Sequence, residues 1–100
     1  MSNEADRLEI TDEGDALVLV GEIDSYTAPL LAARLAERTP VTVLDLSGVS
    51  FLDSSGLRVL VEAHQERADD GGSLRLRTPS APVQHLLEIS GLIGHLDIVD

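Results

Sequence analysis

Two aliphatic runs, each followed directly by a segment with helical periodicity, constrain the fold of this chain more than any other feature. The runs are ALVLVGEI, at residues 16–23, and VTVLDLS, at residues 41–47. After the first run, Ala28, Leu31 and Leu35 recur at the spacing of one helical face. Because strands that alternate with helices are joined by crossovers, they pair in parallel. The pattern therefore predicts an α/β fold.

Three further strands are expected, one at the start of the chain and two near its end. Leu8 and Ile10 alternate with polar residues, and the turn-forming stretch TDEGD then leads into the first aliphatic run, so a β-hairpin opens the chain. The segment SLRLRT, at residues 73–78, places leucines on one face and arginines on the other. This alternation is typical of a half-buried strand towards a sheet edge. The tail HLDIVD is a candidate last strand.

Three helices are expected between these strands. The first begins near Thr27 and Pro29, because a cap and an early proline favour a helix start, and it ends near residues 39–40. The second spans SGLRVLVEAHQERADDGG and is stopped by its two glycines. Its apolar face is expected to carry Leu57, Leu60, Val61, His64 and Ala68. The third covers VQHLLEISG, with Val83, Leu86, Leu87 and Ser90 on one face and Gly91 as its terminator.

In order, these elements read β-β-α-β-α-β-α-β. They predict a mixed sheet of about four to five strands covered by helices. One hundred residues are enough for a single hydrophobic core, so we expect residues 1–100 to form one domain.

The charge and the missing residue types exclude several functions. The formal net charge is -11, which disfavours nucleic acid and anionic membranes as partners, because both are bound through cationic surfaces. All seven basic residues are arginine, so a phosphate-loop lysine and a Schiff base are excluded. The chain has no cysteine, and it has no apolar run near the length of a membrane span or a signal peptide. We expect a cytoplasmic protein without a cofactor.

The segment FLDSSGLR, at residues 51–58, places two adjacent serines at an expected strand-to-helix turn. Three roles fit Ser54 and Ser55: a helix cap, a catalytic nucleophile, or a site where charge is added. A serine cap contributes about 1 kcal/mol and explains one of the two hydroxyls. From these residues alone, capping is the favoured interpretation, and which of the two serines is the cap stays open.

Catalysis and metal binding find little support. His64, His85 and His95 are the only ordinary base candidates, and His64 lies two or three helical turns beyond the serines. The Gly-x-Ser-x-Gly pattern of a nucleophile elbow is absent, and no two histidines have the spacing of metal ligands on one helix face. Glu22 and Asp24 are interpreted as turn and cap residues rather than as paired carboxylates. We therefore expect no catalytic site and no metal site.

The segment VLDLSGVSFLDSSGLRVLV resembles the STAS domain, and more closely the bacterial anti-sigma factor antagonists. GEIDSYTAPLL is similar to the family's segment from the second strand into the first helix, and SGLIGHLDIV is similar to its closing segment. The resemblance implies a partner-switching cycle. The unmodified protein would bind an anti-sigma factor that is also a serine kinase, and phosphorylation would break this complex. A PP2C-type phosphatase would reset the switch.

The resemblance places the phosphoacceptor on Ser54 and leaves Ser55 as the residue at the helix start, where it would supply the cap. It implies a partner-binding surface made of Asp24, Asp53, Ser54, Ser55, Gly56 and Arg58. Asp24 is expected there as an exposed carboxylate. Many members carry glycine where this chain has Arg58, which follows Ser54 by four residues and shares its helical face. Arg58 would either pair with the phosphate or remain a solvated surface residue.

Two rival functions remain. One is a STAS domain that serves as an accessory subunit of a lipid transporter or a stress-signalling complex. The other is a small serine hydrolase. Labelling by a serine-reactive probe would indicate the hydrolase, whereas labelling only by ATP and a cognate kinase would indicate the switch.

Overall fold

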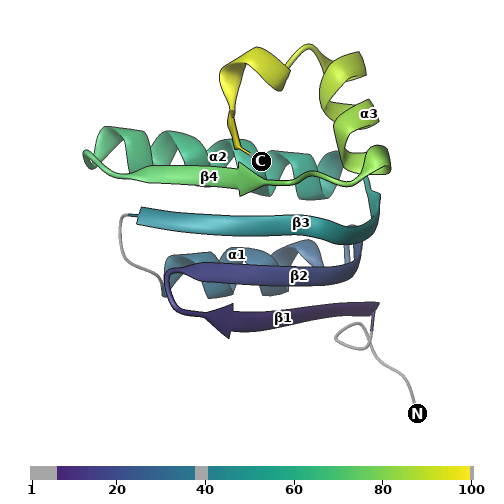
Figure 1. Ribbon diagram of the computed structural model, residues 1–100, viewed down its shortest axis with the longest axis horizontal. Coiled ribbons are helices and arrows are strands. Elements are labelled where there is room, and N and C mark those ends of the chain that lie inside the picture. The colour runs from purple at the N-terminus through teal and green to yellow at the C-terminus, as the bar shows by residue number, and fades with distance from the viewer. Residues whose placement is uncertain (1–6, 38–40, 100) are drawn as a thin grey trace.

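The computed structural model describes residues 7–37 and 41–99, and a five-stranded mixed sheet forms its centre (Figure 1). The strands lie side by side in chain order, and the first two pair antiparallel while the others continue in parallel. The strands are β1 (Leu8–Glu13), β2 (Ala16–Ile23), β3 (Val41–Leu52), β4 (Ser73–Arg77) and β5 (Asp97–Val99). The expected hairpin and the expected order of elements are confirmed.

Two helices cover one face of this sheet. In Figure 1, α1 (Ala28–Ala36) and α2 (Ser54–Asp69) both lie behind the strands, and they contact each other. α3 (Ala81–Ser90) packs against β3 and is followed by a short 3-10 helix, η2 (Ile93–His95). The face that Figure 1 presents to the viewer is the one that α1 and α2 leave open.

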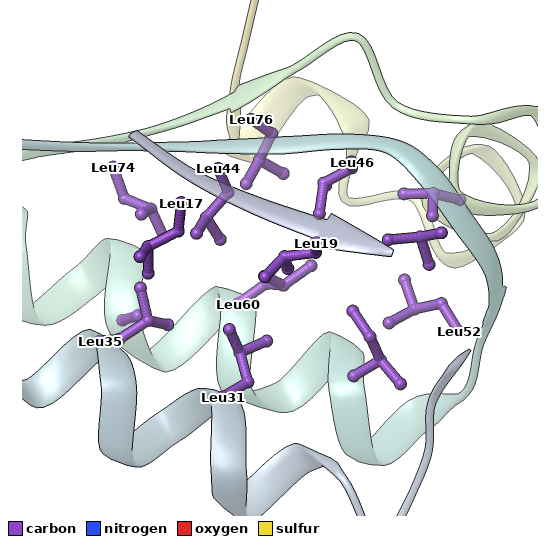
Figure 2. Packing of buried hydrophobic residues seen from close by; sticks show 14 of the residues in the cluster. Leu17, Leu19, Leu31, Leu35, Leu44, Leu46, Leu52, Leu60, Leu74 and Leu76 are labelled. Atoms are coloured by element: carbon purple, nitrogen blue, oxygen red, sulfur yellow. The ribbon is translucent and has the colours of Figure 1, made fainter. Parts of the chain in front are cut away.

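Leucine supplies most of the core between the sheet and these helices (Figure 2). Leu17, Leu44 and Leu76 are register partners on adjacent strands, so their side chains align on the covered face. Burying one such side chain stabilises the fold by about 1.5–3 kcal/mol. The helices contribute the buried residues Ala28, Leu31 and Leu35 of α1, which confirms the predicted face, and Leu60 of α2.

β3 is longer than its aliphatic run indicates. The sequence predicts a strand at residues 41–47, but pairing continues to Leu52. β3 has two register shifts against β2, one between Asp45 and Gly48 and one between Val49 and Phe51, and at each of them β3 carries an extra residue. Such bulges interrupt the alternation on which the prediction depends. As a result, β3 delivers the chain directly to the start of α2.

The predicted inner face of α2 was partly wrong. Leu60 is buried as expected, but Ala68 is exposed, and Arg67 takes the buried place instead. The Arg67 guanidinium donates from Nε to Thr42 Oγ1 at 3.2 Å and from Nη2 to the Leu35 carbonyl at 2.7 Å. Because these acceptors satisfy the charged group, an arginine can occupy an inward position there.

The remaining helix expectations divide in the same way. In α3, Val83 and Leu87 are buried as predicted, whereas Ser90 is exposed. Gly91 follows α3 in the left-handed conformation, at φ 76°, which confirms its role as terminator. The described part of α1 ends at Ala36, and residues 39–40, where its end was predicted, lie outside the described residues. β4 buries Leu74 and Leu76 as expected and lies one strand in from the edge strand β5.

Candidate functional site

The site predicted around the two serines lies where the parallel strands β2 and β3 both end. The Asp53 amide donates to the Ile23 carbonyl at 3.2 Å, which fixes the start of α2 beside the end of β2. The loop from β2 to α1, which carries Asp24, leaves the sheet at the same end. The structure thus brings Asp24, Asp53 and Ser54 to one edge of the sheet.

Asp53, rather than a serine, caps α2. Its Oδ1 accepts hydrogen bonds from the Ser55 amide at 2.9 Å and from the Gly56 amide at 3.2 Å. Asp53 has the extended backbone that an N-cap residue requires. The interpretation of Ser55 as the cap was therefore wrong, because the carboxylate already satisfies the free amides of the first turn.

This arrangement leaves both serine hydroxyls without a structural task. In the part of the chain that the structure describes, neither hydroxyl makes a hydrogen bond to another protein group. Ser54 is exposed and Ser55 is half-buried. The Ser54 hydroxyl is therefore the one that an enzyme in solution can reach more readily.

Gly56 allows α2 to begin so close to the sheet. A Cβ atom at this position would overlap the Leu52 and Ile23 side chains, which come from the ends of β3 and β2. Gly56 is buried within the first turn of the helix. The absence of a side chain at Gly56 thus sets how deeply the helix start sits against the two strands.

Asp24 is held by its own loop. Its Oδ1 accepts from the Tyr26 amide at 2.9 Å and the Thr27 amide at 3.0 Å, and its carboxylate forms an ion pair with Arg7. Only 15% of the side chain is exposed, so the expectation of an exposed carboxylate was wrong. Its interpretation as a turn and cap residue is supported by these bonds. Glu22, by contrast, belongs to β2 rather than to a turn.

These contacts set the protonation of Asp24. Partial burial raises the pKa of its carboxyl group. The hydrogen bonds from the amides of Thr27 and Tyr26 and the charge of Arg7 lower this pKa, and together they outweigh the effect of burial. The net pKa lies below the ordinary value, so the carboxylate stays ionised at neutral pH.

Arg58 is exposed on α2, one helical turn after Ser54. Within residues 7–37 and 41–99, its guanidinium alone among the arginines has neither an ion pair nor a hydrogen bond. The others bind a carboxylate or a backbone carbonyl: Arg7, Arg34, Arg67, Arg75 and Arg77. A free cation therefore shares a helix face with the exposed serine.

The geometry gives no base to either serine from α2. His64 follows Ser54 by ten positions on the same helix, which corresponds to about 15 Å along the axis. Within the described residues, the buried His64 Nδ1 atom has no hydrogen-bond partner, so no carboxylate accepts from this nitrogen as in a Ser-His-Asp triad. Among the described residues, no group of three or more potential ligands could hold a metal ion.

Sequence reasoning missed two exposed aromatic residues at this edge. Tyr26, in the loop after β2, is 62% exposed, and Phe51, near the end of β3, is 47% exposed. The Arg7 guanidinium carbon lies 5.3 Å from the centroid of the Tyr26 ring. The sequence could have drawn attention to them, because they are the chain's only two aromatic residues.

The fold and this turn define a small α/β domain that presents an exposed serine at the start of a helix. The chain belongs to the STAS domain family of anti-sigma factor antagonists, and its residues 7–100 match a family model described as Mlab, STAS domain. It is 38% identical to the anti-sigma-B factor antagonist of Bacillus subtilis (strain 168), over 87% of this chain and 84% of that protein. It is 31% identical to an anti-sigma F factor antagonist of Paenibacillus polymyxa, over 82% and 74% of the two chains.

Solved structures agree with the fold. An anti-sigma factor antagonist from Mycobacterium paratuberculosis superposes with a TM-score of 0.73 at 26% identity, over 92% of this chain and 83% of that one. The phosphorylated form of the Bacillus cell fate determinant SpoIIAA gives a TM-score of 0.68 at 20% identity, over 93% and 90%. In the described residues, no helix has the length and apolar character needed to cross a membrane.

Proposed function

We propose that this chain is an anti-sigma factor antagonist that is controlled by phosphorylation of Ser54. The unmodified chain binds an anti-sigma factor with serine kinase activity and so frees a sigma factor. The observation that carries this proposal is the exposed Ser54 hydroxyl, which has no structural task because Asp53 caps the helix. The names of the relatives support the same partner class.

Charge explains how one modification would end the complex. A phosphate adds about -1.5 to -2 charges to a surface that already carries Asp53 beside Ser54. The free amides and the dipole of a helix start tolerate an anion, so the domain can accept the phosphate without unfolding. The cost falls on the interface, where a thousandfold loss of affinity corresponds to about 4 kcal/mol.

The proposed interface contains Asp24, Asp53, Ser54, Ser55, Gly56 and Arg58, with different tasks. Ser54 and Arg58 are exposed and are proposed to contact the partner. Asp53 and Gly56 shape the turn, and Asp24 shapes the neighbouring loop. Arg58 has no ion pair within the described residues. Once Ser54 carries a phosphate, the Arg58 guanidinium one helical turn away can pair with it.

The remaining partners follow from the same cycle. A PP2C-type phosphatase is proposed to remove the phosphate and reset the switch. We propose that the chain itself is not an enzyme and that residues 1–100 act as one STAS domain in the cytoplasm, where a sigma factor meets its polymerase. Nucleic acid and membranes are not proposed as partners, because the formal net charge is -11.

Intact-mass measurement after incubation with the anti-sigma factor kinase and ATP tests the proposal. The wild-type chain and Ser55→Ala should each gain one phosphate, whereas Ser54→Ala should gain none and still bind the kinase. Ser54→Asp should bind more weakly, although one carboxylate carries less charge than a phosphate. A phosphate on Ser54→Ala that is lost in Ser55→Ala would show that the other hydroxyl is modified.

The second candidate function is that of an accessory subunit in a lipid-transporter or stress-signalling complex, which membership of the STAS domain family leaves open. In that role the chain would bind its complex without any kinase. No phosphate gain with ATP and kinase, together with stable binding to a transporter or stress-signalling complex, would replace the first proposal by this one.

A further inference from the structure

The two aromatic side chains of this protein are used in an unusual way. An aromatic ring buries 150–250 Å² when it is placed in a core, so a small domain gains stability by enclosing it. Here the core is built from aliphatic residues, as Figure 2 shows for its leucines. Both Tyr26 and Phe51 are exposed at the surface. The only two aromatic rings of the chain are thus exposed and are not part of its hydrophobic core.

Both rings lie at the edge of the sheet that carries Ser54. Phe51 is the register partner of Glu22 and precedes Ser54 by three residues. Tyr26 follows Ile23 by three residues, and the Ile23 carbonyl accepts the Asp53 amide. Phe51 thus lies on β3, the strand that leads into Ser54. Tyr26 lies in the loop after β2, with the guanidinium of Arg7 over its ring.

Tyr26 is ordered before any partner arrives. Asp24 accepts the amides of Tyr26 and Thr27, and Arg7 joins the Asp24 carboxylate to the face of the ring. Thr27 strengthens the loop by donating its hydroxyl to the Glu22 carbonyl at 2.8 Å. A side chain that is already held loses less conformational entropy on binding, which favours affinity.

We infer that Tyr26 and Phe51 are the aromatic anchors of the partner interface and insert into apolar pockets of the anti-sigma factor. This inference rests on the proposed function. Aromatic residues are enriched among the few interface positions that carry most of the binding energy, whereas isolated surface aliphatics are ordinary. Ser54, at the same edge, then places the phosphate where its desolvation opposes the insertion of the rings.

The inference also gives Asp24 a different task from direct contact. Its carboxylate is turned to its own loop and to Arg7, so it acts as a positioning residue for Tyr26. Asp24→Asn should therefore weaken binding through the loop. The same substitution in a Tyr26→Ala background should cost little more, because the ring that Asp24 positions is already absent.

Calorimetry with a purified anti-sigma factor kinase from the same cell tests the anchors. Tyr26→Ala and Phe51→Thr should each weaken binding about tenfold or more, which corresponds to about 1.4 kcal/mol. Threonine removes the Phe51 ring and keeps a side chain suited to a strand. Tyr26→Phe should bind nearly as wild type, because it keeps the ring.

Ile89→Ala is the matched control, since Ile89 is 66% exposed, more than either ring, and belongs to α3. It should bind within a factor of about three of wild type. Thermal denaturation confirms that each variant is folded at the temperature of the titration. If Tyr26→Ala and Phe51→Thr bind with the same affinity as Ile89→Ala, the two rings are not anchors of the interface. That result would not contradict the proposed phosphorylation of Ser54. Failure of the wild-type chain to bind would overturn both.

Discussion

At the start of α2, Asp53 caps the helix, and the exposed hydroxyl of its neighbour Ser54 is accessible to modification. Asp53 takes the amides of Ser55 and Gly56, so neither serine is needed as a cap. A serine that caps a helix has its hydroxyl hydrogen-bonded to the backbone. The Ser54 hydroxyl is exposed and, among the residues that the structure describes, it has no hydrogen-bond partner. The presence of two serines in sequence, which capping alone did not explain, is thus consistent with a site kept for modification.

Removing the Asp53 carboxylate tests this division. Asp53→Ala should lower the free energy of unfolding by about 1 kcal/mol, because two amides of the first turn lose their acceptor. For a domain of this size, that loss lowers Tm by ~4–8 °C. Ser55→Ala is the control and should leave Tm nearly unchanged. A larger loss in Ser55→Ala than in Asp53→Ala, measured by urea unfolding, would return the cap to the serine.

The candidate site was predictable from sequence at the residues that form a motif and not at those that depend on contacts. Asp53, Ser54 and Gly56 were placed correctly at a strand-to-helix turn, because a hydrophobic run, a short polar turn and a helical period follow one another there. That Asp24 is tied to Arg7 was hidden, because the two residues are distant in sequence and meet only through the hairpin.

At the scale of elements, α2 can pack closely against the ends of β2 and β3 because Gly56 has no side chain. Gly56→Ala should destabilise the fold by about 1–3 kcal/mol, because the new methyl group overlaps Leu52 and Ile23 and the helix start must shift. Gly94→Ala is the matched control, since a Cβ there meets no atom within 4 Å. Equal urea midpoints for the two variants would show that the helix start has room to move.

Acid should weaken the link between β3 and β4 that Asp45 provides. The Ser47 hydroxyl and amide and the Arg77 guanidinium lower the pKa of Asp45 below its ordinary value of 3.8, although partial burial opposes them. A carboxyl group whose pKa is lower in the folded state stabilises the fold above the unfolded value. That stability is lost as pH falls through the folded value.

Urea unfolding at pH 7 and at acid pH measures this loss. Asp45→Asn should be less stable than wild type at pH 7, and its stability should fall less steeply below about pH 5. Glu62→Gln, at an exposed position on α2, removes the same charge and should keep the wild-type slope. Parallel acid slopes for wild type and Asp45→Asn would remove Asp45 from the acid response.

How far sequence predicts these elements depends on what interrupts their periodicity. α1 follows a clean helical period, and its buried face was predicted residue for residue. β3 was predicted too short because its two bulges break the alternation. The buried face of α2 was partly mispredicted because Arg67 points inward. Its guanidinium is hydrogen-bonded there, whereas a periodicity argument assigns inward positions to apolar residues.

For the whole molecule, acidic charge exceeds what the ion pairs can neutralise. The formal net charge is -11, and the described residues contain four ion pairs between arginine and aspartate side chains. The longest dimension is 42 Å and the radius of gyration is 12.4 Å, so most acidic residues lie within a few tens of ångströms of one another. Unpaired like charges at such distances repel one another and favour expansion of the chain.

Salt should therefore stabilise this protein. Between about 0.01 M and 0.1 M NaCl, the Debye length falls from roughly 30 Å to roughly 10 Å, which screens repulsion across the molecule more than contacts within an ion pair. Tm, measured by circular dichroism, should rise over this range and then level off. The double variant Glu62→Gln with Glu66→Gln removes two exposed negative charges from α2, so its Tm should rise less with salt. A Tm that falls as salt is added would mean that the four ion pairs outweigh the net repulsion.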